Sequence, residues 1–367
     1  MPVLTIQKMK NLFSIILVLI FTNSFAQNEF SIKIQDFSQD FEGRIESNVD
    51  DTIVVSKYEE FVPPYVIRII DKKTNFEALK AYTSNFPDYL LNENHEAIPN
   101  VMELPYGSQS VLIYEDFNFD GIKDFALMNG YNSCYSGPSF DIYLVDKNRK
   151  IEYNESFSDL SNNYCGMFQT DPETKTIHTM TKSGCCWHQF SEFKIIENVP
   201  KPVRIIEESY LMTNDFVEVR EITYQDGKET IQTKNYFPWE EFNSEIIFSF
   251  DLEKSGKKLL VYQTGKILHY VLILEDEEVE FHYPEAYYDE EKQETIYGNF
   301  VYDLDQNTLF FENSDAEYTI YETDKKLGIK VETKGKTYDL KGKKSTVTGT
   351  LKELKNSIYD NLLFDNY

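Results

Sequence analysis

The segment of residues 116–124, DFNFDGIKD, has the residue types and the spacing of a loop that binds a hard metal ion. Oxygen-bearing side chains stand at alternate positions, Asp116, Asn118, Asp120 and Asp124, and the backbone carbonyl of Ile122 supplies a further oxygen between them. Calcium takes six to eight such oxygens, from carboxylates, amides and carbonyls. The spacing therefore predicts a calcium site with these five residues as ligands.

Gly121 stands at the sixth position of the segment, where a calcium loop reverses its direction and needs a glycine. The twelfth position is Leu127, so the bidentate glutamate of an EF-hand is missing, and the flanking residues are typical of strands. We expect a β-hairpin loop in which every carboxylate serves as a ligand, so that calcium is structural and not catalytic. The alternative is a polar surface turn without metal.

The four cysteines, Cys134, Cys165, Cys185 and Cys186, lie within one short region. In an exported protein an even number of cysteines indicates disulfides, and four cysteines allow three connectivities. Cys185 and Cys186 can bond to each other or each to a separate partner, and the sequence leaves this open. A zinc site is the weaker interpretation, because the spacing contains no paired CxxC motif.

Motifs for catalysis are missing from the sequence. It contains no HExxH, GxSxG, Walker or dinucleotide-binding motif, and its five histidines are scattered. Acidic residues are so abundant that no pair of carboxylates stands out as a glycosidase pair. We therefore expect a binding protein and no enzyme activity.

Short runs rich in β-branched and aromatic residues recur along the chain and predict a mainly β fold. They include residues 52–56, 65–70, 110–114, 140–145, 190–196, 219–224, 244–250, 259–264, 270–274, 318–322, 328–333 and 336–340. Helical pattern is limited to a short segment after Lys73 (NFEALKAYTSN) and to residues 349–363, where Leu351, Leu354 and Ile358 have helical spacing. We expect a propeller-like or sandwich-like N-terminal β domain and a C-terminal antiparallel β domain with a short terminal helix.

Residues 1–26 have the layout of a secretory signal peptide, with lysines before an apolar run and small residues before a cleavage site near Ala26. Met9 is an alternative start, because a complete signal follows it. The apolar run is too short to span a membrane, so we expect an exported, periplasmic or secreted protein without membrane insertion. The expected domains are residues 27–240, with the metal loop and the cysteines, and residues 241–367.

The 367 residues include 62 acidic and 36 basic ones, which gives a formal net charge of −26. Such a charge repels nucleic acids and anionic lipids and attracts cations and basic proteins. Residues 275–294 mix dense acid with aromatic residues, and they are either a solvated strand edge or a docking surface for a basic protein.

Three segments follow one another in an order that resembles a known family: YEDFNFDGIKDFALM, FDIYLVDKNRKIEYNESFSDLS and DPETKTIHTMTKSGCCWHQFSEFKI. They resemble the exported bacterial β-propeller-like calcium-loop family, which includes periplasmic inhibitors of peptidoglycan hydrolases, some of them immunity proteins. The resemblance covers about residues 65–206 and leaves the C-terminal half unmatched. It implies that Asp116, Asn118, Asp120, Ile122 and Asp124 correspond to the calcium ligands of the family.

Two binding functions follow as hypotheses, and a hydrolase that uses an unrecognised pair of carboxylates is a third. The first is inhibition of a basic cell-wall hydrolase or lysozyme, by a rigid surface that covers its cleft. The alternative is a calcium-dependent module that binds carbohydrate or a cell surface through exposed tyrosines.

Overall fold

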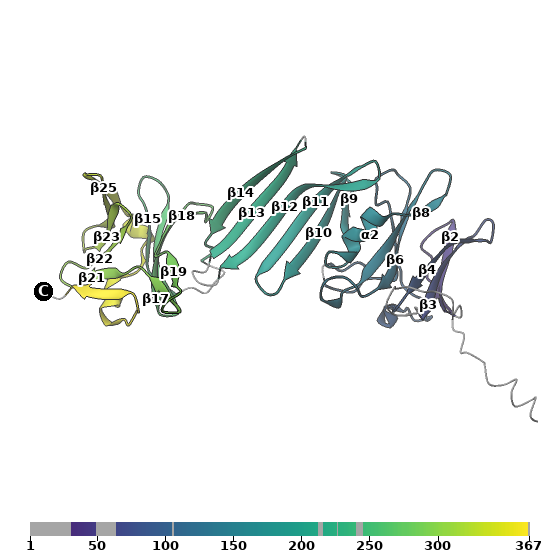
Figure 1. The fold of residues 1–367 in the computed structure, drawn as a ribbon, viewed down its shortest axis with the longest axis horizontal. Helices are drawn as coiled ribbons and strands as arrows, with labels where there is room; N and C mark the ends of the chain where they lie inside the picture. Colours follow the sequence, from purple (N-terminus) through teal and green to yellow (C-terminus); the bar gives the residue numbers. More distant parts are fainter. Residues whose placement is uncertain are drawn as a thin grey trace, which may run out of the picture. The chain divides into compact units, whose positions relative to one another are not determined.

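The computed structural model describes residues 31–48, 64–104, 106–211, 216–225, 227–239 and 245–365. The expected signal peptide and the strand expected at residues 52–56 lie outside these ranges. In the described residues the chain is mainly β, as predicted, and Figure 1 shows its strands arranged in several sheets. None of these sheets closes into a propeller, and the sandwich-like layout stays a prediction.

The chain divides into two compact units. Unit 1 comprises Met1–Thr181 and Ser191–Val203, and unit 2 comprises Lys182–Phe190 and Arg204–Tyr367. The division expected near residue 240 partitions the chain differently and stays a prediction. None of the helices in the described ranges is long and apolar enough to cross a membrane.

Unit 1 contains two antiparallel four-stranded sheets. The first has the order β1-β2-β3-β4, with β1 (Ser31–Ile34), β2 (Phe41–Ser47), β3 (Tyr65–Asp71) and β4 (Glu77–Thr83). The second has the order β5-β6-β7-β8, with β5 (Leu112–Glu115), β6 (Asp124–Gly130), β7 (Ser139–Val145) and β8 (Ile151–Tyr153). The unit also holds 3-10 turns η1 (Asp88–Leu90) and η2 (Cys134–Ser136) and the helix α2 (Glu155–Asn162).

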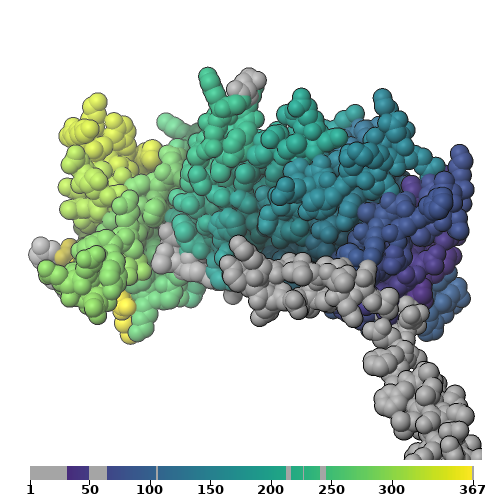
Figure 2. All heavy atoms as spheres, turned by 45° about the vertical axis from the view of Figure 1, so that its right-hand side comes forward, coloured from purple at the N-terminus to yellow at the C-terminus, as the bar shows by residue number. Residues whose placement is uncertain are grey.

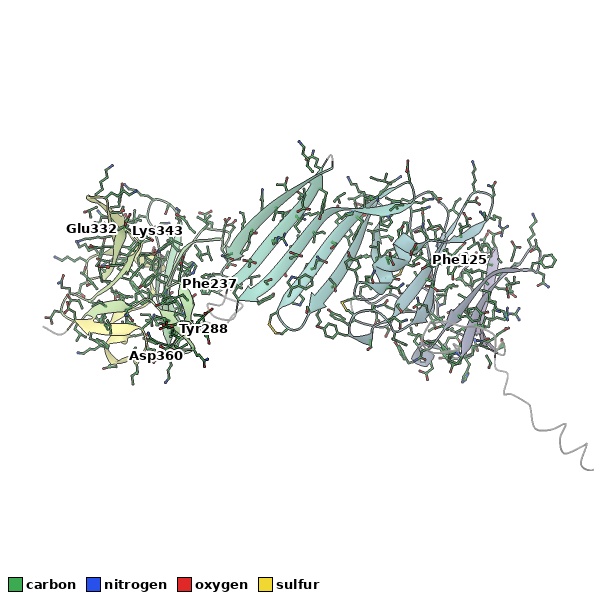
Figure 3. All side chains as sticks on the ribbon, viewed as in Figure 1. Phe125, Phe237, Tyr288, Glu332, Lys343 and Asp360 are labelled. Atoms are coloured by element: carbon green, nitrogen blue, oxygen red, sulfur yellow. A yellow bond between two sulfur atoms is a disulfide. The ribbon has the colours of Figure 1, made fainter. Side chains whose placement is uncertain are left out.

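The helix α2 is fixed to β7 by its serines. The buried hydroxyl oxygens of Ser158 and Ser161 accept the backbone N–H groups of Ile142 and Phe140 at 2.9 and 3.2 Å. Phe157, on the same helix, is fully buried in the core of unit 1 together with Phe125 of β6, which Figure 3 labels. This sheet and its helix form the scaffold that carries the predicted metal loop.

The helix expected after Lys73 is wrong, because residues 77–83 form β4. The carboxylate of Asp71 accepts the backbone N–H groups of Lys73 and Thr74 and so turns the chain back. The following residues then pair with β3 in antiparallel register, from Tyr65 opposite Thr83 onward. Sheet pairing thus overrides the helix propensity of the segment.

A six-stranded sheet has the order β14-β13-β12-β11-β10-β9, and its middle strands contribute residues to both units. Its strands are β9 (Gln169–Asp171), β10 (Thr176–Ser183), β11 (Trp187–Ile196), β12 (Val199–Leu211), β13 (Phe216–Gln225) and β14 (Lys228–Tyr236).

Unit 2 contains two larger sheets and one hairpin. The five-stranded sheet β18-β17-β16-β15-β26 is built from β15 (Glu245–Asp251), β16 (Lys258–Thr264), β17 (Ile267–Ile273), β18 (Val279–Tyr283) and β26 (Thr348–Gly349). The six-stranded sheet β25-β24-β23-β22-β21-β27 is built from β21 (Phe300–Asp303), β22 (Thr308–Asn313), β23 (Ala316–Glu322), β24 (Leu327–Thr333), β25 (Lys336–Lys341) and β27 (Leu362–Asp365). The hairpin joins β19 (Ala286–Asp289) to β20 (Glu294–Tyr297), and η3 (Lys344–Thr346) and η4 (Leu351–Asn356) are 3-10 turns.

The expected terminal helix is shorter than predicted and is not an α-helix. Thr350 caps η4 by accepting the backbone N–H of Lys352, and the turn ends at Asn356. Leu351 and Leu354, three residues apart, are buried on one side of this 3-10 turn, whereas Ile358 lies beyond it and is 86% exposed. A 3-10 turn aligns residues three apart, so the spacing of Leu351 and Leu354 fits this turn, and the predicted α-helical period is wrong here.

Unit 2 is held together by stacked aromatic rings. Phe311 stacks on Tyr318 at 4.7 Å between ring centroids and on Tyr283 at 4.5 Å. A second cluster contains Phe237, labelled in Figure 3, whose ring lies 4.6 Å from that of Tyr262. Many aromatic residues of unit 2 are thus used in packing against one another.

Candidate functional site

The predicted metal loop connects β5 to β6. Glu115 at the end of β5 lies opposite Asp124 at the start of β6, and the two strands continue as an antiparallel pair to Leu112 and Leu127. The loop is therefore a β-hairpin loop, as predicted, and not part of a helix–loop–helix motif.

The backbone of the loop turns at two residues with positive φ. Gly121 has a φ of 89° and Phe119 a φ of 61°. The space around the Cα of Gly121 is open, so a Cβ there would be excluded by the backbone conformation and not by a neighbour. The glycine is thus required by the sharp reversal, as the sequence predicted.

Two loop carboxylates hold this turn by accepting backbone N–H groups. Asp116 accepts the N–H of Asp120 at 3.1 Å with Oδ1 and that of Gly121 at 2.8 Å with Oδ2. Asp120 accepts the N–H of Ile122 at 2.8 Å with Oδ1. Each of these carboxylate oxygens accepts with one lone pair, which leaves others for a further partner.

Asp124 is the most buried of the predicted calcium ligands. Its side chain is fully buried, and its two oxygens accept the backbone N–H groups of Phe117 at 2.9 Å and Val145 at 2.8 Å. Burial, together with the nearby carboxylates of Asp120 and Asp116, raises the pKa of this carboxyl to about 7, against the effect of the two N–H donors. Asp124 thus ties the loop to β7 while carrying a charge that burial disfavours.

Asn118 connects the loop to a turn that the sequence analysis did not single out. Its Nδ2 donates to Asp120 Oδ2 at 3.2 Å and to Asn198 Oδ1 at 3.1 Å. The backbone carbonyl of Asn198 also accepts from the side chain of Asn154, the N-cap residue of α2, at 3.2 Å. Asn198 lies beside Glu197 in a two-residue turn between β11 and β12 in which both residues have positive φ. The pair Glu-Asn between two strand patterns is a turn signal that could have indicated this position.

The donor set of the loop suits calcium. Three carboxylates, one amide and one carbonyl are hard oxygen donors, and none of the three carboxylates forms an ion pair with a lysine or arginine of the described ranges. However, in those ranges no three His, Cys, Asp or Glu side chains converge closely enough to hold a metal ion. The structure therefore shows the donors in a loop closed on its own backbone, and calcium binding stays a proposal.

The cysteines form two disulfides, as expected, and the structure gives the connectivity that the sequence left open. Cys134 of η2 bonds to Cys165, which is buried and donates its backbone N–H to Met180 at 2.8 Å. Cys185 and Cys186 bond to each other in the turn between β10 and β11. The first disulfide joins cysteines 31 residues apart in the sequence. The second joins two adjacent residues, so it does not connect distant segments of the chain.

The most buried histidine lies in unit 2 and away from the loop in sequence. His269 on β17 is 2% exposed, its ring stacks on that of Tyr262 at 5.1 Å, and its Nε2 has no hydrogen-bond partner among the described residues. Burial, together with the nearby His282, lowers the pKa of His269 to about 4. The ring is therefore neutral at neutral pH.

Each unit has one cavity of interest. In unit 1, a cavity of about 340 Å³ is lined by aromatic rings and one carboxylate, from Tyr65, Phe86, Asp88, Tyr89 and Tyr131. In unit 2, a cavity of about 360 Å³ lies at the β15–β16 turn and the end of β25. Neither cavity was predicted, because each brings together residues that are distant in sequence.

Comparisons with known proteins give no family. No protein-family model matches the chain, and no curated protein matches it. Among solved structures, a Xanthomonas protein described as related to a type IV secretion system is 19% identical, with a TM-score of 0.42 over 57% of this chain and 96% of that one. A prolyl endopeptidase (8% identity, 88% of this chain and 42% of that one) and a luciferin-regenerating enzyme (10%, 88% and 94%) give TM-scores of 0.23 and 0.21. Similarities this distant carry no conclusion about fold or function.

Proposed function

We propose that the protein is an exported, calcium-stabilised binding protein that inhibits a peptidoglycan hydrolase or lysozyme by covering its cleft. The observation that carries the proposal is the loop of residues 116–124, which presents five oxygen donors on a β-hairpin. The resemblance of residues 65–206 to calcium-loop inhibitors of such hydrolases supplies the activity.

Calcium would have a structural role in this function. Asp116, Asn118, Asp120, the carbonyl of Ile122 and Asp124 would hold the ion, and its charge would offset the repulsion between the three carboxylates. Because the same loop bonds to Asn198 and, through Asp124, to β7, a bound ion would stiffen several elements of unit 1 together.

The charge of the protein supports a basic partner. A net charge of −26 raises the rate at which a basic protein such as a lysozyme meets this surface. The aromatic cavity of unit 1 offers a recess for a basic side chain, because the ring faces attract a cation and Asp88 adds a negative charge. Tyr89 on its rim is 62% exposed and so is accessible to a partner.

The alternative is a calcium-dependent module for carbohydrate or a cell surface. It is favoured by exposed tyrosine rings, since aromatic faces stack on sugar rings. Tyr89, Tyr135, Tyr287 and Tyr288 are each 61–62% exposed. Glycan-array binding with and without chelator separates the two functions, because an inhibitor need not bind free sugars.

The calcium part of the proposal is tested by thermal unfolding in calcium and in chelator. Ligand at 100 times its dissociation constant adds about 2.7 kcal/mol, so the melting temperature should rise in calcium. Asp120→Ala should abolish this rise. Asp146→Ala is the matched control, since Asp146 caps an exposed turn through the N–H groups of Asn148 and Lys150 but lies outside the loop. No calcium effect on the wild type would overturn the metal assignment.

The inhibitory part is tested separately, with purified protein added in calcium to lysozyme-type and amidase-type hydrolases acting on peptidoglycan. We expect saturable inhibition of at least one of them, weakened by Asp88→Asn if the aromatic cavity receives a basic side chain. Full hydrolase activity at micromolar excess of the protein would refute inhibition, even if calcium stabilises the fold.

A further inference from the structure

The C-terminal part of this acidic protein carries a concentrated positive charge. Residues 323–357 contain ten lysines and four acidic residues, although the whole chain has a net charge of −26. In the described ranges none of these lysines forms an ion pair with a carboxylate. The ten are Lys325, Lys326, Lys330, Lys334, Lys336, Lys341, Lys343, Lys344, Lys352 and Lys355.

The strand β25 lies within this segment and is an edge of its sheet. It pairs only with β24 among the strands of that sheet, from Thr333 opposite Lys336 to Gly328 opposite Lys341. All six of its residues are exposed. Figure 2 shows the yellow-green residues of this part of the chain at the surface of unit 2, and Figure 3 labels Glu332 on β24 and Lys343 just after β25.

The direction of the main-chain groups on β25 follows from the backbone hydrogen bonds at its C-terminal end. Gly342 donates its N–H to Leu327 on the β24 side, and Lys341 accepts the N–H of Glu253 on the other side. Main-chain groups of successive strand residues alternate in direction. Thr337 and Asp339 therefore present their N–H and C=O groups outward, away from β24, and these groups have no backbone partner among the described residues.

The cavity of about 360 Å³ adjoins the end of this open edge. Leucine side chains supply its apolar part, from Leu252, Leu272 and Leu340, of which Leu340 belongs to β25 and is 40% exposed. Lys254, Lys257 and Lys341 also line it, together with Glu253, Glu280 and Asp339.

Part of the charge around the cavity is already used within the fold. Lys257 pairs with Glu280, and Asp339 accepts the hydroxyl of Tyr321 at 2.7 Å. Among the described residues, Lys254 and Lys341 form no ion pair. The cavity is lined by equal numbers of lysines and carboxylates, so the excess of positive charge lies on the surrounding segment of residues 323–357 and not on the cavity itself.

The two faces of β25 differ in a way that specifies a ligand. Leu340 lies opposite the buried Ile329, on the face toward the core. Asp339 lies opposite Lys330 on the other face. Lys341, two residues after Asp339 on β25, lies on that same face. A strand added to this edge would therefore meet Tyr338 and Leu340, with Lys336, on one face and Lys341 beside Asp339 on the other.

A second copy of β25 is a poor occupant of the edge. Antiparallel pairing of two copies through their outward main-chain groups, centred on residue 339, would place the Asp339 carboxylates of the two copies opposite each other, and like charges opposite each other are destabilising. Two copies would also bring two lysine-bearing edges together, and lysines on an edge strand keep like strands apart. The same lysines attract an acidic strand.

We propose that β25 binds an extended acidic peptide segment of another protein as an added strand. The backbone of the peptide bonds to Thr337 and Asp339, its acidic side chains face Lys330 and Lys341, and an apolar side chain enters the cavity beside Leu340. This site is in unit 2 and is independent of the calcium loop and of hydrolase inhibition.

The test is fluorescence anisotropy with a labelled peptide of alternating glutamate and leucine, titrated with the full-length mature protein. We expect saturable binding. The same peptide with N-methyl groups on alternate residues, which cannot pair as a strand, should bind at least about tenfold more weakly. Polyglutamate of equal length should also bind more weakly, since it lacks the apolar side chains. Equal binding of all three would overturn the proposal in favour of unspecific attraction to an anion.

Two variants locate the site. Thr337→Pro removes an outward N–H without breaking the β24 ladder, so the fold should persist while peptide binding weakens about tenfold. Lys341→Glu should weaken binding through charge, whereas Lys352→Glu, the matched control on η4, should change it by less than about twofold. Unchanged binding in both Thr337→Pro and Lys341→Glu would refute the site. A dimer in sedimentation that Thr337→Pro dissociates would also refute it, because the edge would then be occupied by a second copy.

Discussion

Asp124 in unit 1 and His269 in unit 2 are both buried titratable side chains, but the fold accommodates them differently. Asp124 is fully buried and accepts two backbone N–H groups, those of Phe117 and Val145. His269 is 2% exposed, stacks on Tyr262, and has an Nε2 without a hydrogen-bond partner in the described part of the chain. Burial favours the neutral form of each, so the pKa of Asp124 rises to about 7 and that of His269 falls to about 4.

The difference shows two ways of using a buried polar group. The carboxylate of Asp124 organises the backbone around it, because two main-chain donors of separate elements depend on it. The imidazole of His269 mainly fills space among aromatic rings. We therefore expect the stability of unit 1 to depend on the presence of the Asp124 side chain. The stability of unit 2 should depend on the protonation state of His269.

Asp124→Ala should have the largest effect on stability, a loss of about 4 kcal/mol, because two buried N–H groups lose their acceptor at about 2 kcal/mol each. Denaturant unfolding in chelator measures this loss without any contribution from calcium. Asp146→Ala, at an exposed turn, is the control and should lose far less. A loss below about 1 kcal/mol for Asp124→Ala would show that the loop does not depend on its buried carboxylate.

Removal of the disulfide between Cys134 and Cys165 should cost about 3–4 kcal/mol, since it closes a loop of 31 residues in the unfolded chain. Replacing Cys185 and Cys186 by serine should change the unfolding free energy little, since adjacent residues close no comparable loop. Both double variants can be compared by denaturant unfolding. Equal losses would show that Cys185 and Cys186 contribute through packing and not through chain entropy.

Acid should destabilise unit 2 through His269. The pKa of His269 is depressed in the folded state, so its contribution is present above the unfolded value of 6.5 and is lost as the pH falls toward 4. The loss over this range is about 3 kcal/mol, at about 1.4 kcal/mol per pKa unit. His269→Phe keeps an aromatic ring against Tyr262 and removes the titration.

The difference between wild type and His269→Phe, measured by unfolding at pH 7 and at pH 4.5, isolates this histidine from the many carboxylates that titrate in the same range. We expect the variant to be the more stable protein at pH 4.5 by most of that amount. Parallel pH dependence of the two proteins would mean that His269 is protonated without penalty.

Charge changes on the lysine-rich segment should have the smallest effect on stability. Lys330→Glu and Lys341→Glu replace exposed side chains that have no ion-pair partner among the described residues, so each should change the unfolding free energy by less than about 0.5 kcal/mol. A larger loss would show that these lysines offset the surrounding acidity of the chain, and would weaken their assignment to peptide binding.

Much of the fold could be predicted from local pattern. The alternation of residues 318–322 and 328–333 predicted strands where β23 and β24 lie, and the flanks of residues 116–124 predicted the hairpin that β5 and β6 form. Local pattern failed at β4, where pairing with β3 outweighs helix propensity, and at η4, where three-residue spacing was taken for an α-helix.

The candidate sites could be predicted only in part. The metal loop is continuous in sequence, so its donors and its glycine were visible. The bond from Asn118 to Asn198, the pairing of Cys134 with Cys165 and the cavity beside β25 depend on segments brought together by folding. The positive charge of residues 323–357 is visible in the sequence. That these lysines surround an open sheet edge is known only from the position of β25 in the fold.

The strand β27 has a consequence for the order of events during synthesis. It pairs in parallel with β21, from Phe300 beside Leu362 to Asp303 beside Asp365, although β22 to β25 are made in between. The ribosome therefore releases β21 long before its parallel partner exists. Until residue 365 has emerged, β21 is an edge of the sheet, and its main-chain groups on the side that β27 later covers are open to mispairing with other chains.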